Sequence, residues 1–176
     1  MKCLPKLVIT DIDGVWTDGG MYYDNLGNES KKFNTNDSAG ILFLSFLDIP
    51  VAIISGENTE IVRRRADKLG ISHLYLGVKN KVQVAQKLCE ELDVLLSEVA
   101  FIGDDINDIP LLKKVGLSAT PHNAPKYVKD VVDLKLNING GDGAFREFVE
   151  VIINKFSDIN IVLERYYKSL NKRLDE

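Results

Sequence analysis

The sequence predicts an α/β fold: a Rossmann-like parallel sheet with helices on both faces. Short β-branched apolar runs have the pattern of buried strands, and helix-like stretches alternate with them along the chain. Such alternation implies βαβ units, in which the connecting helices cover a parallel sheet. One further segment breaks the alternation and has the pattern of a β-hairpin. At 176 residues the chain is long enough for one core and too short for two comfortable ones.

The expected strands are apolar runs that end where polar residues begin. The first, Leu7–Thr10, leads into Asp11; the others are Val51–Ile54, His73–Leu76, Val99–Ile102 and Leu117–Ala119. The helices expected between them are Ala39–Leu47, Glu60–Leu69, Lys81–Leu92 and Ile109–Val115. Suitable N-caps precede two helices and glycines follow two: Asp37 or Ser38, Asn58 or Thr59, Gly70 and Gly116.

The hairpin is expected over residues 20–33. Its arms, Gly20–Asp24 and Glu29–Phe33, flank the turn-rich sequence Asn25-Leu26-Gly27-Asn28. An isolated hairpin is marginally stable in water, so we expect this one to pack on something, such as a neighbouring subunit.

The C-terminal region contains two expected helices, Phe145–Phe156 and Ile159–Leu170. The second is amphipathic and becomes basic toward its end. We therefore divide the chain into a core, residues 1–156 with the hairpin included, and a helical tail, residues 157–176.

Composition excludes several classes of function. A net charge of −4 and a pI near 5.3 argue against nucleic acid as the main partner. No apolar stretch approaches the ~18 residues that a membrane span needs, and the N-terminus lacks the apolar core of a signal peptide. Cys3 and Cys89 form neither a metal-type spacing nor a disulfide framework, so we expect a reducing, cytoplasmic environment.

Carboxylates gather where two expected strands end. They follow the first strand and Val99–Ile102: Asp11, Asp13, Asp104, Asp105 and Asp108. Ligands of open α/β sheets bind at the carboxyl edge, where these groups would repel one another unless a cation compensates. All-oxygen ligands suit Mg²⁺. A solvated acidic loop is the alternative.

A hydroxyl and an ammonium group are expected at the same edge. Ser55 ends the second strand, and Lys81 begins the helix after the third. Taken singly, Ser55 could be a helix cap and Lys81 a surface lysine. Together with the carboxylates they favour a bound phosphate.

These side chains suggest a division of labour for cleaving a phosphate ester. Asp11 would attack phosphorus while Mg²⁺ and Lys81 offset the charge on the phosphoryl oxygens. Asp13 could protonate the leaving alkoxide and then activate water. Asp104 would bind the metal directly. Asp108, and also Asp105, would orient water ligands or Lys81.

The chain resembles the haloacid-dehalogenase superfamily of phosphatases. The resemblance spans about residues 6–150 and lies in four motifs: Asp11–Gly19 (DIDGVWTDG), Ser55, Lys81 and Gly103–Asp108 (GDDIND). The DxDGVxTDG form, with the hairpin, resembles a small branch that dephosphorylates 3-deoxy-2-keto sugar acids. The resemblance implies Asp11 as nucleophile and Asp13 as general acid/base, with the Asp13 backbone carbonyl and Asp104 as metal ligands.

The same resemblance bears on how the site is covered. Only 41 residues separate Asp13 from Ser55 and only 25 separate Ser55 from Lys81, so no cap domain fits. Branch members form tetramers through their hairpins, which predicts a homotetramer here. In the glycine-rich segment 140–147, Arg146 resembles a residue that can reach a neighbouring site and bind a substrate carboxylate. Alternatively, Arg146 pairs with Glu150 on its own helix.

The substrate is expected to be an eight- or nine-carbon sugar acid phosphate. Octulosonate 8-phosphate phosphatases usually carry arginine where this chain has Glu57, so the segment more closely resembles nonulosonate 9-phosphate phosphatases. Glu57, Arg64 and Lys68 are expected on one helix stripe, where they could bind the substrate or form a solvated face. Asp37 is either a substrate contact or a helix cap.

Two other classes of function share parts of this pattern. A receiver domain also joins Asp, Mg²⁺, Ser/Thr and Lys on a parallel sheet, but Asp13 would hydrolyse its acyl phosphate and defeat a lasting signal. A regulatory or oligomerisation module that has lost activity is the second, and the intact motifs argue against it. Metal-dependent release of phosphate from an aryl ester would separate both from a phosphatase.

Overall fold

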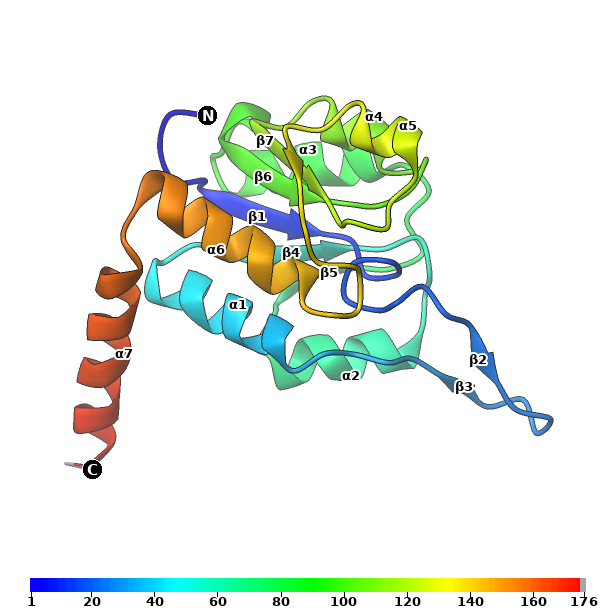
Figure 1. Ribbon diagram of the computed structural model, residues 1–176, viewed down its shortest axis with the longest axis horizontal. Coiled ribbons are helices and arrows are strands. Elements are labelled where there is room, and N and C mark those ends of the chain that lie inside the picture. The colour runs from blue at the N-terminus through cyan, green and yellow to red at the C-terminus, as the bar shows by residue number, and fades with distance from the viewer. Residues whose placement is uncertain (175–176) are drawn as a thin grey trace.

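Four wholly buried strands form the centre of one six-stranded sheet: β1 (Leu7–Thr10), β4 (Val51–Ile54), β6 (Val99–Ile102) and β7 (Leu117–Thr120). The computed structural model describes residues 1–174 (Figure 1). Edge strands β5 (His73–Tyr75) and β8 (Leu134–Lys135) complete the order β5-β4-β1-β6-β7-β8, and every pairing is parallel. The predicted parallel sheet is confirmed, and β8 is an addition to it.

Helices cover both faces of the sheet (Figure 1). One face packs against α1 (Asn36–Phe46), α2 (Glu60–Lys68) and α6 (Ala144–Phe156). The other packs against α3 (Lys81–Glu91), α4 (Ile109–Leu112) and α5 (Lys126–Lys129), and the short 3₁₀ helix η1 (Leu96–Glu98) leads into β6. Strand side chains alternate between the layers: Val8 belongs to the first, whereas Leu7 and Ile9 belong to the second.

The hairpin consists of β2 (Tyr22–Tyr23) and β3 (Glu29–Ser30) and projects away from the sheet (Figure 1). Its turn is held by Asp24, whose Oδ1 accepts backbone N–H bonds from Leu26 and Asn28. The predicted hairpin is therefore confirmed, with shorter strands than expected. It exposes large apolar side chains, Met21, Tyr22, Tyr23 and Leu26.

The break between the two C-terminal helices falls at the predicted division between the core and the tail, after residue 156. Helix α6 ends at Phe156 and packs on α1, whereas α7 (Ile159–Leu174) leaves the layers beside the sheet (Figure 1). Arg165 connects α7 to the end of α1 through the Phe46 carbonyl and Asp48. A separate tail stays a prediction, and its last two residues lie outside the described part of the chain. None of the described helices is long and apolar enough to cross a membrane.

Asp37 caps a helix other than the one expected. Helix α1 begins at Asn36 with Thr35 as its N-cap, so the prediction that Asp37 caps its own helix is wrong. Its buried Oδ1 instead accepts the backbone N–H of Arg146 at 3.1 Å, in the first turn of α6. Gly143 precedes α6 and has no side chain to cap it. The Asp37 carboxyl therefore satisfies one of that helix's free N–H groups.

Candidate active site

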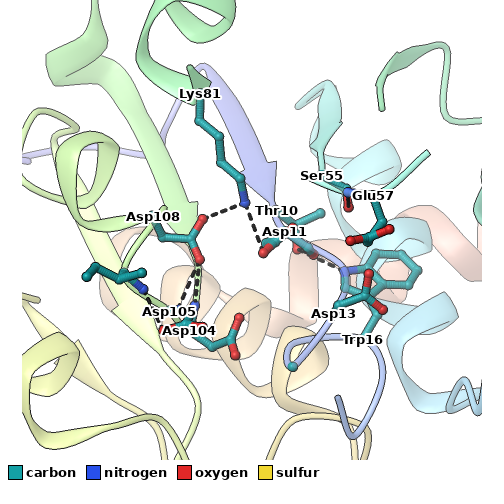
Figure 2. Close-up of polar contacts among 12 residues, drawn as sticks. Thr10, Asp11, Asp13, Trp16, Ser55, Glu57, Lys81, Asp104, Asp105 and Asp108 are labelled. Atoms are coloured by element: carbon teal, nitrogen blue, oxygen red, sulfur yellow. Dashed lines mark hydrogen bonds and ion pairs between the residues drawn. The ribbon is translucent and has the colours of Figure 1, made fainter. Parts of the chain in front are cut away.

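The central strands bring the motif residues to one edge of the sheet (Figure 2). Strands β4, β1 and β6 are parallel neighbours, so the residues that follow them, Ser55, Asp11 and Asp104, lie side by side. All three line one pocket, together with Asp13 and Glu57.

Lys81 joins two carboxylates beneath this pocket. Its ammonium nitrogen lies 2.9 Å from Oδ2 of Asp11 and 2.6 Å from Oδ1 of Asp108 (Figure 2). The lysine begins α3, whose N-cap Asn80 accepts the N–H of Gln83. Burial alone would lower the pKa of Lys81, but the carboxylates of Asp11 and Asp108 outweigh it and raise that pKa. Lys81 is therefore a fixed cation at the sheet edge.

Asp108 holds the backbone of the acidic loop, residues 104–108, which follows β6. Its Oδ2 accepts the backbone N–H groups of Asp104 at 3.0 Å and Asp105 at 3.2 Å, while Oδ1 binds Lys81. A Cβ at position 103 would overlap this carboxylate, which accounts for Gly103 in the GDDIND motif. With both oxygens engaged by the protein, Asp108 positions the loop and the lysine.

Asp11 and Asp104 have the properties of metal ligands. Carboxylate oxygens of Asp11, Asp104 and Asp108 lie within 4.8 Å of one another. Oδ1 of Asp11 and Oδ1 of Asp104 are buried without a hydrogen-bond partner among residues 1–174. Burial first, and neighbouring carboxylates second, raise the pKa of Asp11 to about 7 and that of Asp104 to about 8. In the described chain these two buried Oδ1 atoms have no hydrogen-bond donor beside them to offset their negative charge. The residues present therefore fit the Mg²⁺ that the sequence predicts.

Asp13 lies across the pocket from the acidic loop (Figure 2). Its Oδ1 accepts bonds from Lys31 Nζ at 2.6 Å and from the Thr17 hydroxyl at 3.3 Å. Its Oδ2 is buried and has no partner in the described chain. Lys31 was not identified from the sequence, because no motif or spacing connects the hairpin to Asp13.

The loop between Asp11 and Gly19 folds back on itself over Trp16. The Ile12 carbonyl accepts N–H bonds from residues 15–17, which makes a tight turn. Trp16 is fully buried, with its ring 4.8 Å from that of Phe145 and its Nε1 donating to Thr10 Oγ1 at 2.9 Å. Gly14 lies against the Asp104 carboxylate, where a Cβ would overlap it. The aspartates of the first motif are thus held by a packed turn.

The expected stripe of Glu57, Arg64 and Lys68 does not form. Helix α2 begins at Glu60 after an extended Thr59, so Glu57 lies outside the helix, and the prediction is wrong on this point. Glu57 lines the pocket, whereas Arg64 and Lys68 line a separate hollow beside Phe33. The sequence correctly placed the start of this helix at Glu60, and the error was to extend its stripe back to Glu57.

Asp37 and Arg146 do not line the pocket that contains Asp11 and Asp13. Arg146 Nε lies 2.6 Å from Glu150 Oε1, and its guanidinium lies 4.4 Å from the centroid of the Phe43 ring. This is the ion pair that the sequence offered as the alternative to substrate binding. Asn107, for which the sequence predicted no role, does line the pocket.

Comparison with known proteins identifies the family. The model of the haloacid dehalogenase-like hydrolases matches residues 52–148, more than half of the chain. The chain belongs to this family. This hydrolase is 43% identical over 148 residues to the 3-deoxy-D-manno-octulosonate 8-phosphate phosphatase of Haemophilus influenzae, covering 84% of the chain and 82% of the relative. It is 40% identical to the phosphatase of that name from Escherichia coli, covering 84% and 79%.

Solved structures agree with this assignment. An octulosonate 8-phosphate phosphatase from Moraxella catarrhalis, in complex with magnesium, phosphate and KDO, matches the hydrolase with a TM-score of 0.88 at 33% identity, covering 92% of this chain and 93% of that one. The cobalt-bound Haemophilus influenzae phosphatase matches with a TM-score of 0.82 at 42% identity, covering 86% and 88%.

These relatives confirm the family, and they favour a different substrate from the one that the sequence favoured. The predicted superfamily, its capless sugar-acid phosphatase branch and the class of phosphoric monoester hydrolase are confirmed. The relatives named above are octulosonate phosphatases, so they favour the eight-carbon alternative over the nonulosonate that Glu57 suggested.

Proposed function

We propose that this hydrolase removes phosphate from 3-deoxy-D-manno-octulosonate 8-phosphate, with bound Mg²⁺ and through a phosphorylated Asp11. The observation that carries the proposal is the convergence of Asp11, Asp104 and Lys81, which leaves one buried oxygen free on each carboxylate. The relatives support the identity of the substrate.

The first displacement uses Asp11 as nucleophile. A carboxylate oxygen of Asp11 attacks phosphorus, and the bond between phosphorus and the ester oxygen breaks. The Lys81 ammonium, 2.9 Å from Asp11, holds that carboxylate and offsets charge on the phosphoryl group. Mg²⁺, held by Asp104, Asp11 and the Asp13 carbonyl, supplies further positive charge when bound. Uncatalysed hydrolysis of such esters is so slow that these enzymes reach accelerations up to ~10²¹-fold.

Asp13 moves the protons in both displacements. It gives its proton to the ester oxygen as the sugar acid leaves, and then takes a proton from the water that attacks the phosphorylated Asp11. Phosphate departs and the Asp11 carboxylate is restored. The unpartnered Oδ2 of Asp13, in a residue that lines the pocket, is the oxygen suited to this exchange.

The remaining contacts concern substrate recognition. Ser55, nearly fully buried after β4, is suited to bind a phosphoryl oxygen. Arg64 and Lys68 could hold the keto-acid carboxylate, and Arg146 could do so in a neighbouring subunit after leaving Glu150. Asp37 is placed as a cap, so we assign it no contact with substrate.

A nonulosonate 9-phosphate is the second candidate substrate, because Glu57 lines the pocket where octulosonate members are expected to carry arginine. Phosphate release from both esters, with and without chelator, separates the candidates. We expect kcat/KM to be at least about tenfold higher for the eight-carbon ester, a difference of ~1.4 kcal/mol. A preference for the nine-carbon ester would overturn the substrate and leave the chemistry standing.

We further propose a cytoplasmic homotetramer joined through the hairpins, with neither nucleic acid nor membrane as partner. The exposed Met21, Tyr22, Tyr23 and Leu26 support it, since an apolar hairpin gains stability by packing on another copy. Light scattering of the purified chain should give four times the monomer mass, and Tyr23→Asp should lower it. A monomeric wild-type chain would refute the assembly.

A further inference from the structure

Lys31 is a buried cation at the base of an otherwise exposed hairpin. Its side chain is 2% exposed, whereas the neighbouring Lys32 side chain is 57% exposed. A buried ammonium is costly unless it is paired. Lys31 Nζ lies 2.6 Å from Asp13 Oδ1 and 3.8 Å from Glu29 Oε1, so Asp13 is its near partner.

The contacts of Asp13 are divided between its two oxygens. Oδ1 receives the Lys31 ammonium and the Thr17 hydroxyl, while Oδ2 is buried without a partner in residues 1–174. Rotating the carboxylate out of this orientation would break a short, charge-assisted bond. The lysine therefore fixes the orientation of the Asp13 carboxylate, in which one oxygen stays available for proton exchange in the pocket.

We propose that Lys31 is a positioning residue for the general acid/base: it orients the Asp13 carboxylate so that Oδ2 faces the ester oxygen. This inference rests on the proposed function, in which Asp13 protonates the leaving group. The hairpin thereby contributes to catalysis within its own subunit, independently of any role in assembly.

The leaving group provides the test. The alkoxide of a sugar acid is a strong base and needs a proton as it departs, whereas p-nitrophenolate leaves without one. The parameter kcat/KM covers the steps through departure of the leaving group. For Lys31→Met, we expect kcat/KM to fall at least about tenfold more with the octulosonate 8-phosphate than with p-nitrophenyl phosphate.

A double-mutant cycle shows whether Lys31 acts through Asp13. In an Asp13→Asn background, adding Lys31→Met should change kcat/KM by less than about twofold with either ester. Lys32→Met, which changes the exposed neighbour, should match wild type. Thermal unfolding and light scattering check that the variants fold and assemble alike, and Lys31→Gln replaces Lys31→Met if the latter does not fold.

The outcomes separate the inference from the proposed function. Equal losses with both esters, or a further large loss in the Asp13→Asn background, would overturn the positioning role. If Asp13→Asn itself shows no selectivity for the leaving group, the assignment of Asp13 as general acid fails. If wild type cleaves neither ester with Mg²⁺, the proposed function fails.

Discussion

The Lys81 ammonium lies 2.9 Å from Oδ2 of Asp11, while Oδ1 of that carboxylate is buried without a partner in the described chain. One oxygen of Asp11 is thus fixed by a cation and the other is free, in a carboxylate that clusters with those of Asp104 and Asp108. Such a carboxylate is oriented before substrate arrives, which is what an in-line attack on phosphorus requires.

Removing Asp108 should weaken the site without removing a direct metal ligand. In Asp108→Asn, a neutral amide replaces the carboxylate that binds Lys81 and the backbone of Asp104 and Asp105. We expect activity or Mg²⁺ affinity to fall about 10–100-fold, as for other groups that orient metal ligands. Asp130→Asn, which alters an exposed ion pair with Lys126, is the matched control and should leave both unchanged. Unaltered Mg²⁺ titrations and rates in Asp108→Asn would contradict this role.

Metal binding should release protons. In the metal-free protein, burial and the neighbouring carboxylates raise the pKa of Asp11 to about 7 and of Asp104 to about 8. Mg²⁺ binds the ionised form, so its apparent affinity should be at least about tenfold higher at pH 8 than at pH 6. Calorimetry in buffers of different ionisation enthalpy measures the proton release directly. Affinity that does not change over this range would show that the carboxylates are already ionised.

The same groups make stability depend on pH. The unfolded chain loses these protons near pH ~4, whereas the folded metal-free chain keeps them to higher pH. Their contribution to the free energy of unfolding is therefore fully present below about pH 4 and is lost as pH rises toward 8. Saturating Mg²⁺ should restore more stability at pH 8 than at pH 6, as measured by urea unfolding. The opposite trend would contradict the metal assignment.

The capping of α6 by the Asp37 side chain, which comes from α1, can be tested by substitution. Burial raises the pKa of its carboxyl to about 6, so the stability that the protonated group provides below about pH 4 is lost as pH rises to about 6. Asp37→Asn keeps an acceptor for the Arg146 N–H and removes the charge, so relative to wild type it should gain stability as pH rises from 4 to 7. Asp37→Ala should lose about 1 kcal/mol. Urea unfolding at both pH values measures this, and a raised KM in Asp37→Asn with unchanged stability would favour substrate contact instead.

The central sheet and the catalytic edge could be predicted from the sequence because their signals are local. Runs such as Val51–Ile54 must be strands buried on both faces, and Asp11 directly follows one of them. Strand β8 has two residues and helix α5 has four, too few to produce a periodic pattern.

Other features depend on contacts between distant segments. Glu57 precedes α2, as the predicted helix start at Glu60 implies, but its place in the pocket lining depends on how the loop after β4 packs. Asp37 caps α6, 109 residues away along the chain, and Lys31 reaches Asp13 across a hairpin turn. Such pairings are set by how the layers pack, so periodicity and local motifs could not reveal them.

The proposed mechanism requires that Asp11 forms a covalent bond to phosphorus. Rapid acid quenching during turnover, followed by borohydride reduction, converts an aspartyl phosphate to homoserine, which peptide mass spectrometry can locate. We predict homoserine at position 11 in wild type, and in Asp11→Asn a folded protein with no adduct and a rate at least about 10³-fold lower. An adduct on another residue, or undiminished turnover by Asp11→Asn, would contradict the proposed mechanism.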